Sequence, residues 1–481
     1  MICVSVTPAS RTLAQVDLLN ASRYGDMVEL CIDRLIKEPD FKELLSTIDK
    51  PILISCRRKK DGGQFEGTEE ARKALLRQAI ASGPAYIELE LDIANEIPRF
   101  GNTQRVISFT RLDRPEYDIE SIFEEAAAAK ADIVKFSWPT PTIDDVWPLL
   151  AAVTQKRMLP IVGNGRGTPE MTFSLLGKKY GCPWIYAALE KGMEAYPGQV
   201  TVHELDEYYH FNDINKQTRF VAVAGFSQTL TTTLRIFNLA FRHMKMNVRC
   251  LPLTIGRVDR LAKMLEILKV QAVLLGGEEA TRAMSLATQI DKREFDTQYI
   301  DLMLSQPDGW HGYNTLLRTC LPTIDRSFVG GIQNKTILVI GTNGIAHTVV
   351  SALASRQNVV NVCSTDTQAS EQLARMYQVK HVPFAHLYET LCDIIIIADS
   401  NMKFGKGQKE IMPSVLRPHH TVIDLSNLPL KSPLFEEAIA RGCKIMSPSI
   451  IYMDEIQRQF KALTGQEIPS EAILEVMGAR S

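Results

Sequence analysis

The chain has 481 residues, a formal net charge of −2 at pH 7 and a hydrophobic share of 45%, which is typical of a soluble globular protein with two or three domains. This charge favours neither nucleic acid nor an anionic membrane as a partner, and the longest positive run is RRKK at 57–60. Nine cysteines occur without CxxC pairs or zinc spacing, so we expect neither structural disulfides nor a metal site. The start, MICVSVTP, is typical of a strand rather than a signal peptide, and no apolar stretch is long enough to span a bilayer, so we expect a cytoplasmic protein.

Short β-rich runs recur along the first half of the chain. They are ICVSVTP from 2, MVELCID from 27, ILISCR from 52, YIELELD from 86, RVISFT from 105, DIVKFS from 132, LPIVGN from 159 and WIYAAL from 184. Helix-like segments such as 69–82 and 124–130 lie between most of them. This repeated βα pattern predicts a (β/α)8 TIM barrel, in which the active site lies at the C-terminal ends of the strands.

Polar residues at the ends of these predicted strands converge on one barrel mouth. They are Glu29, Arg57, Glu90, Thr110 and Lys135. Because they combine a lysine, an arginine and two glutamates, they suit a small anionic carbonyl compound as ligand.

Lys135 lies in the apolar run ADIVKFSWP, 131–139. Its apolar neighbours would partly desolvate the ammonium group and lower its pKa toward the range in which a free amine attacks carbonyl carbon. Lys135 is therefore a candidate Schiff-base residue. From the run alone, the alternative is an ordinary strand-end lysine whose charged head reaches solvent.

The N-terminal part of the chain resembles type I 3-dehydroquinate dehydratase, up to about residue 210. This family comprises shikimate-pathway lyases that remove water through an imine between a barrel lysine and the substrate ketone. The matching stretches are VELCIDRL (28–35), SCRRKKDGGQFEG (55–67), YIELELD, ADIVKFS and PGQVTVHEL (197–205).

The resemblance assigns roles to individual residues of the barrel. It implies that Lys135 is the Schiff-base lysine and that Glu90 is a catalytic glutamate. It also implies that Glu29, Arg57 and Gln199 contact the substrate. The resemblance implies no cofactor for this reaction.

Some residues of the family's site are replaced in this chain. Thr110 stands where the family has a histidine that acts as general acid and base. We therefore expect Thr110 to contact the substrate without acting as an acid or base. Two substrate-binding arginines have become Cys31 and Ser174. Because losing a general acid or base commonly lowers the rate about 10²- to 10⁴-fold, we expect impaired dehydratase turnover. Three other arginines could restore positive charge to the mouth: Arg111, Arg114 and Arg166.

The polar segment YYHFNDINKQTR, 208–219, predicts a domain boundary near residue 216. The β/α pattern resumes after it. We therefore expect a barrel domain over 1–215, a substrate-binding domain over 216–330 plus 446–481, and a Rossmann-type domain over 331–445.

The segment KTILVIGTNGIAHTVVSALAS, 335–355, has the strand, turn and helix pattern of a dinucleotide-binding unit. Gly341, Asn343 and Ala346 occupy the fingerprint positions, with Gly344 beside them as a further candidate contact. Asn343 adds a side chain where the usual glycine lets pyrophosphate approach, so a βα unit without a nucleotide remains the alternative.

Asp366 ends the next predicted strand, NVVNVCSTD. An acid at this point accepts a hydrogen bond from a ribose 2′-hydroxyl and repels a 2′-phosphate, so any cofactor should be NAD rather than NADP.

The second half resembles shikimate dehydrogenase, and the two halves together resemble the bifunctional fusion of that enzyme with 3-dehydroquinate dehydratase. The C-terminal segment MDEIQRQFKALTG, 453–465, belongs to the resemblance. Thr229 and Thr231 stand at the family's substrate-binding serines, and Glu455 stands at its substrate glutamine.

The dehydrogenase residues themselves are replaced in this half. Ala280 lies near the expected position of the catalytic lysine, and Leu316 replaces its partner aspartate. Thr365 replaces the arginine that binds the NADP phosphate. Without the lysine and aspartate, nothing obvious shuttles the proton that accompanies hydride transfer, so we expect no dehydrogenase activity.

Three hypotheses for the function remain open. The chain is a weak bifunctional shikimate-pathway enzyme, a divergent lyase that uses Lys135 on another carbonyl substrate, or a pseudoenzyme that acts as a metabolite-binding regulator or scaffold. We expect a monomer or homodimer whose barrel binds a dehydroquinate-like small molecule and can form an imine.

Overall fold

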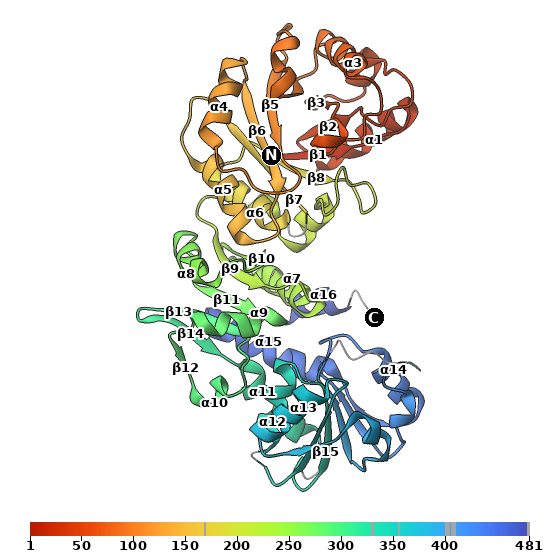
Figure 1. Cartoon of the computed structure of the whole chain (residues 1–481), viewed down its shortest axis with the longest axis vertical. Coiled ribbons are helices and arrows are strands. Elements are labelled where there is room, and N and C mark those ends of the chain that lie inside the picture. The colour runs from red at the N-terminus through yellow and green to blue at the C-terminus, as the bar shows by residue number, and fades with distance from the viewer. Residues whose placement is uncertain (168–169, 329–330, 355, 400–404, 406–409, 479–481) are drawn as a thin grey trace. The chain divides into compact units, whose positions relative to one another are not determined.

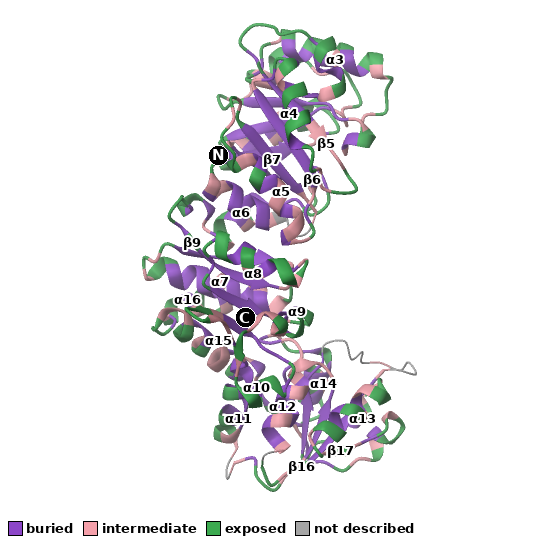
Figure 2. Cartoon of the chain, turned by 60° about the vertical axis from the view of Figure 1, so that its left-hand side comes forward, coloured by how far each residue is buried: buried purple, intermediate pink, exposed green. Residues whose placement is uncertain are grey.

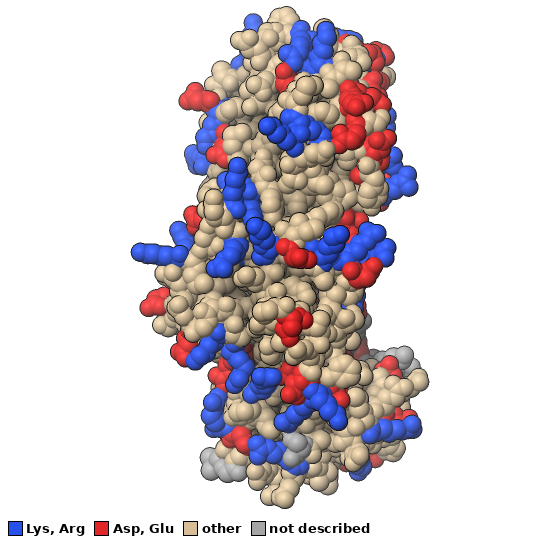
Figure 3. Space-filling model, turned by 90° about the vertical axis from the view of Figure 1, so that its left-hand side faces the viewer, with Lys and Arg blue, Asp and Glu red and all other residues tan. Residues whose placement is uncertain are grey.

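The computed structural model describes residues 1–167, 170–328, 331–354, 356–399, 405 and 410–478. The chain forms two compact units, of which the first comprises Met1–Arg219 and Lys245–Leu261 and the second comprises Phe220–Met244 and Ala262–Ser481. Positive and negative side chains both occur over the face drawn in Figure 3, in keeping with the net charge of −2. No helix in the described ranges combines the length and the apolar character that crossing a membrane requires.

The first unit contains the eight parallel strands of a nearly closed barrel (Figure 1). The strands are β1 (Ile2–Val6), β2 (Met27–Cys31), β3 (Ile52–Ser55), β4 (Tyr86–Glu90), β5 (Gln104–Thr110), β6 (Ile133–Pro139), β7 (Ile161–Arg166) and β8 (Ile185–Ala188). They pair in the order β7-β6-β5-β4-β3-β2-β1-β8, and β7 and β8 lie side by side at the closure. The predicted (β/α)8 barrel is confirmed.

Helices alternate with these strands along the chain. They are α1 (Arg11–Tyr24), α2 (Phe41–Leu45), η1 (Lys59–Asp61), α3 (Glu69–Ala81), η2 (Leu91–Glu96), α4 (Ile119–Ala128), α5 (Ile143–Thr154) and α6 (Glu170–Tyr180), followed by η3 (Glu204–Tyr208) and η4 (Phe211–Asp213). Helix α3 begins where the Thr68 hydroxyl accepts a hydrogen bond from Ala71 N, and it buries Leu76 and Ile80. Figure 2 shows the barrel strands as largely buried, so their inward side chains form a desolvated interior.

A six-stranded mixed sheet begins the second half of the chain. Its strands are β9 (Arg219–Ala224), β10 (Val248–Leu253), β11 (Ala272–Leu275), β12 (Gln289–Ile290), β13 (Leu302–Gln306) and β14 (Gly309–Tyr313), in the order β10-β9-β11-β13-β14-β12. The helices of this region are α7 (Gln228–His243), α8 (Val258–Ile267), α9 (Glu278–Arg282), η5 (Ala283–Leu286), α10 (Lys292–Phe295) and α11 (Thr315–Ser327). Strand β13 runs antiparallel to both of its neighbours.

The Rossmann-type region has a parallel sheet with the order β17-β16-β15-β18-β19-β20. Its strands are β15 (Thr336–Ile340), β16 (Val359–Cys363), β17 (Lys380–His381), β18 (Ile394–Ile397), β19 (Thr421–Asp424) and β20 (Lys444–Met446). Its helices are α12 (Gly344–Ala354), α13 (Thr367–Met376), η6 (Phe384–Glu389), η7 (Pro413–Val415) and α14 (Pro433–Ala440), and α15 (Pro448–Thr464) and α16 (Ser470–Gly478) follow. The four isoleucines of β18 are all buried, as expected for a parallel strand covered on both faces. The predicted strand–turn–helix unit is β15 and α12, except for residue 355, which lies outside the described residues.

Candidate functional site

Strand β6 places Lys135 inside the barrel, where its side chain is 2% exposed. The ammonium Nζ lies 2.8 Å from Glu88 Oε2, an acid on β4 whose side chain is also 2% exposed. The same Nζ lies 4.4 Å from the centre of the Tyr186 ring. A buried carboxylate and an aromatic face both stabilise the charged form of the amine, so Lys135 is held as one half of a desolvated ion pair.

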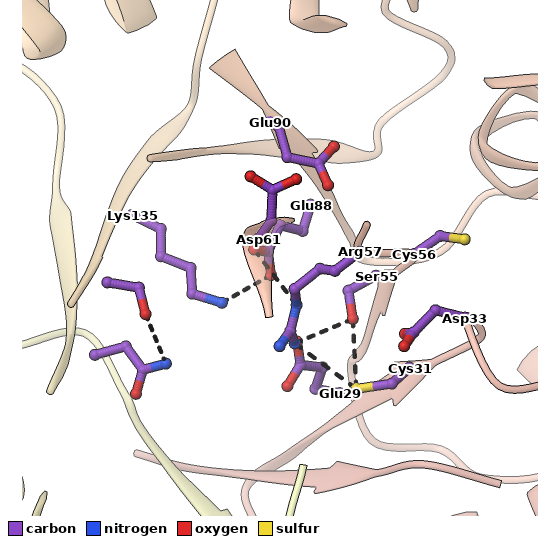
Figure 4. Close-up of polar contacts among 12 residues, drawn as sticks. Glu29, Cys31, Asp33, Ser55, Cys56, Arg57, Asp61, Glu88, Glu90 and Lys135 are labelled. Carbon is purple, nitrogen blue, oxygen red and sulfur yellow. Dashed lines mark hydrogen bonds and ion pairs between the residues drawn. The ribbon is translucent and has the colours of Figure 1, made fainter. Parts of the chain in front are cut away.

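A second buried ion pair lies beside the first (Figure 4). Arg57, which follows β3, donates to Glu29 on β2, and its Nε lies 3.8 Å from Glu88 Oε1. The other oxygen of Glu29 accepts from Ser5 Oγ at 2.6 Å, and Ser5 Oγ accepts from Gln199 Nε2 at 3.2 Å. The predicted residues Glu29, Arg57 and Gln199 therefore lie in one hydrogen-bonded chain.

The charges of this cluster balance, because Lys135 and Arg57 face Glu29 and Glu88. Burial disfavours the ionised carboxylate of Glu29, but the charges of Arg57 and Lys135 outweigh this effect and lower its pKa to about 2. Burial also disfavours the charged guanidinium of Arg57, and the neighbouring glutamates outweigh it and raise that pKa. The surrounding opposite charges therefore stabilise the charged forms of Glu29 and Arg57.

Three buried polar atoms at this cluster find no hydrogen-bond partner among the residues that the structure describes: Arg57 Nε, Glu88 Oε1 and Ser108 Oγ. Buried polar atoms in folded proteins are nearly always hydrogen-bonded, so exceptions call for an explanation. Here the unpaired atoms flank the lysine, because Ser108 on β5 pairs in register with Lys135. A polar ligand beside Lys135 would supply the missing partners.

Glu90, the predicted catalytic glutamate, lies away from this cluster. Both of its carboxylate oxygens accept from Arg72 Nη1 at 2.9 Å, and Arg72 on α3 is fully buried. Figure 4 shows the Glu90 carboxylate directed away from Lys135. Burial raises its pKa to about 7 in spite of the charge of Arg72.

Glu88 is the carboxylate that the sequence interpretation missed. Glu90 and Lys135 share a level of the barrel, since each pairs in register with Ser108. The strand register alone would therefore predict Glu90 as the partner of Lys135. A lysine side chain, however, is long enough to reach Glu88, two residues before Glu90 on β4. Glu90 is hydrogen-bonded to Arg72 instead. The signal in the sequence was the two-residue spacing of Glu88 and Glu90, which places both side chains on the same face of β4.

Arg166, at the end of β7, crosses the mouth of the barrel. Its guanidinium carbon lies 4.6 Å from the centre of the Tyr196 ring, and its nitrogens occupy the space that a Cβ on Gly62 would need, a residue that follows η1 after β3. The other two candidate arginines lie differently. Arg111 pairs with Glu116 at 2.8 Å, and Arg114 lies 4.0 Å from Asp113 with most of its side chain exposed. Arg166 therefore lies beside residues that follow two other barrel strands, β3 and β8.

Thr110 ends β5 and lines a cavity of about 600 Å³. The described residues of its wall include Glu90, Ser108, Arg58 and Asp61. Lys135 is not among these residues, so the threonine and the lysine occupy different surroundings. The cavity borders the cluster through Ser108.

The residues of the dinucleotide fingerprint form local contacts of their own. Asn343 Oδ1 accepts from Ala346 N at 3.0 Å and so caps α12. The Tyr299 ring packs against Gly344, the first residue of that helix. Asp366 Oδ1 accepts from Ala369 N at 3.0 Å and caps α13. These residues do not fit a dinucleotide, because the helix start is capped by a side chain and covered by a ring where pyrophosphate would need open N–H groups.

Gly341 keeps one feature of the fingerprint. Its φ is +130°, and a Cβ added there would lie 2.7 Å from Asp399 Cβ. The glycine is therefore required by its backbone conformation and by close packing, whether or not a nucleotide binds.

The expected dehydrogenase positions are apolar in the structure. Ala280 and Leu316 are both buried. Thr229 lines a cavity of about 140 Å³, which also includes Glu455. Thr231 is not among the described residues of that wall, and its hydroxyl donates to Ser227 O on its own helix at 3.1 Å. Only one of the two predicted threonines is therefore directed at the cavity.

No group of three or more histidine, cysteine, aspartate and glutamate side chains within the described ranges is arranged to hold a metal ion.

Comparisons with known proteins agree with this architecture. Residues 2–216 match the family model of type I 3-dehydroquinase. The bifunctional 3-dehydroquinate dehydratase/shikimate dehydrogenase of Arabidopsis thaliana, a chloroplastic protein, is 23% identical over 99% of this chain and 84% of its own length. The 3-dehydroquinate dehydratase of Dehalococcoides mccartyi is 27% identical over 43% of this chain and 94% of its own length.

Among solved structures, a shikimate dehydrogenase in complex with NADP+ aligns with 56% of this chain and 97% of its own, at 20% identity and a TM-score of 0.49. The chain therefore carries a type I 3-dehydroquinase domain, and a shikimate dehydrogenase-like region follows it in the order of the bifunctional relative.

Proposed function

We propose that the barrel binds a small anionic carbonyl compound of the dehydroquinate type and captures it as an imine on Lys135. The observation that carries this proposal is the buried Lys135–Glu88 ion pair at 2.8 Å, with the Arg57–Glu29 pair beside it. Burying a charged lysine carries a large desolvation cost even when the lysine is paired with a carboxylate. A role in imine formation would explain why the fold retains it.

The pair supplies the proton transfer that imine formation needs. Lys135 gives a proton to Glu88, and the neutral amine attacks the ketone carbon to form a carbon–nitrogen bond. The carbonyl oxygen takes up one proton from the attacking nitrogen and one from the protonated Glu88 and leaves as water, which produces the protonated imine and returns Glu88 to its carboxylate form. Glu88 is the proton acceptor in this scheme because it is the carboxylate in contact with the amine.

Elimination from the imine requires a further acid and base. Thr110 does not titrate near neutral pH, and Glu90 is bound to Arg72 through both oxygens. Capture without efficient dehydration is therefore the behaviour that this arrangement supports, and a metabolite-binding regulator is the second candidate function. A divergent lyase would have to draw its general acid from the substrate or from water.

Borohydride reduction tests the imine directly. The full chain is incubated with 3-dehydroquinate and borohydride, and its intact mass is measured. We expect a single adduct in the wild type and none in Lys135→Met. Lys73→Met is the matched control, because Lys73 is also buried and also lies 2.8 Å from a carboxylate, that of Glu96. An adduct that persists in Lys135→Met would overturn the proposal.

The growth of enone absorbance in the same mixture separates the two candidate functions. Adduct with negligible product supports the regulator. Adduct with sustained product supports the lyase.

We further propose that the second unit has no dehydrogenase activity. Alanine and leucine stand at the two positions that would move the proton, and capping contacts occupy Asn343 and Asp366. Reduction of 3-dehydroshikimate with NADPH or NADH, followed by cofactor absorbance, tests this statement, and turnover with either cofactor would contradict it.

We also place the protein in the cytoplasm. All nine cysteines of the sequence lie within the described residues, are buried and form no disulfide there, and cysteines outside disulfides are typical of a reducing compartment. Fractionation of cells that express the tagged full chain tests this assignment.

A further inference from the structure

A groove of about 760 Å³ lies between α11 and α15, two neighbouring helices of the second unit (Figure 1). Its volume is within the range of about 300–1,000 Å³ that is typical of small-molecule sites. The helices run antiparallel. Gln459 on α15 donates to Thr315 at the start of α11, and Asp454, earlier on α15, pairs with Arg326 near the end of α11. The described walls of this groove and of the cavity beside Thr229 share no residue.

Cationic side chains outnumber carboxylates in the described wall of the groove. Four are cationic and two are acidic: Arg318, Arg326, Arg458 and Lys461, against Asp454 and Glu467. On α11 the two arginines are eight residues apart, which places them on one face and about 12 Å from each other along the helix axis. On α15 the arginine and the lysine are three residues apart and also share a face. The groove therefore has a cationic stripe on each side.

The two carboxylates of the wall neutralise only part of this charge. Asp454 pairs with Arg326 and also accepts from the Thr323 hydroxyl. Glu467 lies 3.6 Å from Lys461, and both of these side chains are largely exposed. Each acid therefore has a cation of its own, and neither is paired with the remaining two arginines of the wall.

Those two arginines, Arg318 and Arg458, approach the same end of the groove. Arg318 donates through Nε to Glu294, a buried acid outside the described wall. Arg458 is exposed and forms no ion pair or hydrogen bond with the residues that the structure describes. Because the helices are antiparallel, Arg458 lies toward the Arg318 end of α11. Two guanidinium groups at one end of a groove repel each other unless an anion lies between them.

The composition of the wall favours a compact anion over an acidic peptide. The apolar side chains in its described part are those of Pro322 and Ala462, and none of those residues is aromatic. Protein partners are usually anchored by aromatic or large apolar side chains in matching pockets, which this wall does not offer. Guanidinium groups instead match phosphate, whose oxygens accept two parallel hydrogen bonds from one arginine.

We infer that the groove between α11 and α15 binds a compact ligand with two or more phosphate groups, such as the phosphate chain of a nucleotide or of a small polyphosphate. The phosphates lie between Arg318 and Arg458, with Lys461 as a third cation. The inference concerns the second unit and depends neither on imine formation in the barrel nor on dehydrogenase chemistry.

Calorimetric titration of the full chain at pH 7 with three probes tests the inference. Tripolyphosphate is the expected ligand type, sulfate is a single anion, and a hexaglutamate peptide represents an acidic protein segment. We expect tripolyphosphate to bind with a Kd below about 0.1 mM, more weakly as salt screens the charges, and at least about tenfold more tightly than sulfate or the peptide. Absence of tripolyphosphate binding, or equal or tighter binding of sulfate or the peptide, would overturn the inference.

Variants assign the binding to this groove. Arg458→Gln with Lys461→Gln removes two exposed cations and should weaken tripolyphosphate at least about tenfold, because one hydrogen bond to a charged group contributes about that much to affinity. The matched control is Arg375→Gln with Arg441→Gln, which removes the same charge from exposed ion pairs on α13 and α14 and should change the affinity less than about twofold. Arg458→Gln alone serves if the double variant fails to fold. Unchanged binding in the folded groove variant, or equal weakening in the control, would refute the assignment.

Discussion

Replacing Glu88 by glutamine removes the carboxylate that pairs with Lys135 and should sharply destabilise the barrel. Coulomb's law with an effective dielectric constant of about 20 gives an attraction of about 6 kcal/mol at the 2.8 Å separation, and desolvation of the two groups offsets part of it. Because removing one partner of a buried pair commonly costs about 3–5 kcal/mol, we expect a loss in that range for Glu88→Gln. Arg57, 3.8 Å from Glu88, adds to the uncompensated positive charge.

A double-mutant cycle isolates the contribution of the pair. Lys135→Met alone leaves Glu88 without its closest cation, whereas Lys135→Met with Glu88→Gln leaves only the balanced Arg57–Glu29 pair. We therefore expect the double variant to lose much less stability than the sum of the single variants, with a coupling free energy of about 3 kcal/mol.

Urea unfolding followed by tryptophan fluorescence measures the cycle. A Trp310→Phe background leaves Trp138, Trp147 and Trp184, which all lie in the first unit. The control is the Lys59–Glu66 pair, which has a similar separation of 3.0 Å but side chains that are 67% and 81% exposed. Its cycle should give a coupling below about 1 kcal/mol. An equally small coupling for Lys135 and Glu88 would refute the buried, charged pair.

Three further outcomes are expected. Because the folded state raises the pKa of Glu455, the free energy of unfolding should fall as the pH rises above about 4.5, by at most about 1.4 kcal/mol per pH unit. In urea unfolding between pH 5 and 8, the stability of Glu455→Gln should therefore increase relative to that of the wild type. The exposed control Glu467→Gln should show the same pH dependence as the wild type. Gly341→Ala should cost about 2 kcal/mol in thermal or urea unfolding, because alanine at a φ of +130° is strained and its Cβ would meet Asp399. A ligand at 100 times its Kd adds about 2.7 kcal/mol to stability, so millimolar NAD or NADP should leave the melting temperature unchanged if the fingerprint is blocked; a shift would contradict the poor fit.

The barrel was predictable because its signal is local and repeated. Each strand begins within about two residues of the run that predicts it, and β4, β6 and β8 show the agreement. A repeated βα unit can be recognised in the sequence without knowledge of long-range contacts. The same reasoning placed Glu29, Arg57 and Lys135 together, because their prediction required only that each lie near the C-terminal end of a barrel strand.

The partners of individual side chains were not predictable in this way. Glu90 lies at the expected level of the barrel, but Arg72 reaches it from a helix outside the sheet. Asn343 and Asp366 match a cofactor pattern, yet Asn and Asp are also preferred helix caps, and both serve as caps here. The same residue type can therefore serve either as a cofactor contact or as a helix cap, and its neighbours in the folded structure decide which.

The charge balance of the barrel suggests how an anionic ligand would be accommodated. If the Lys135 proton moves to Glu88, both groups become neutral, and the Arg57–Glu29 pair remains balanced, so the interior offers no net positive charge before or after the transfer. Arg166 at the mouth would then be a cation that can face the carboxylate of a bound ligand, from its position over Tyr196. Chemistry and charge recognition would thus be divided between the floor and the mouth of the barrel, and a change at Arg166 should weaken ligand capture while the buried pairs stay intact.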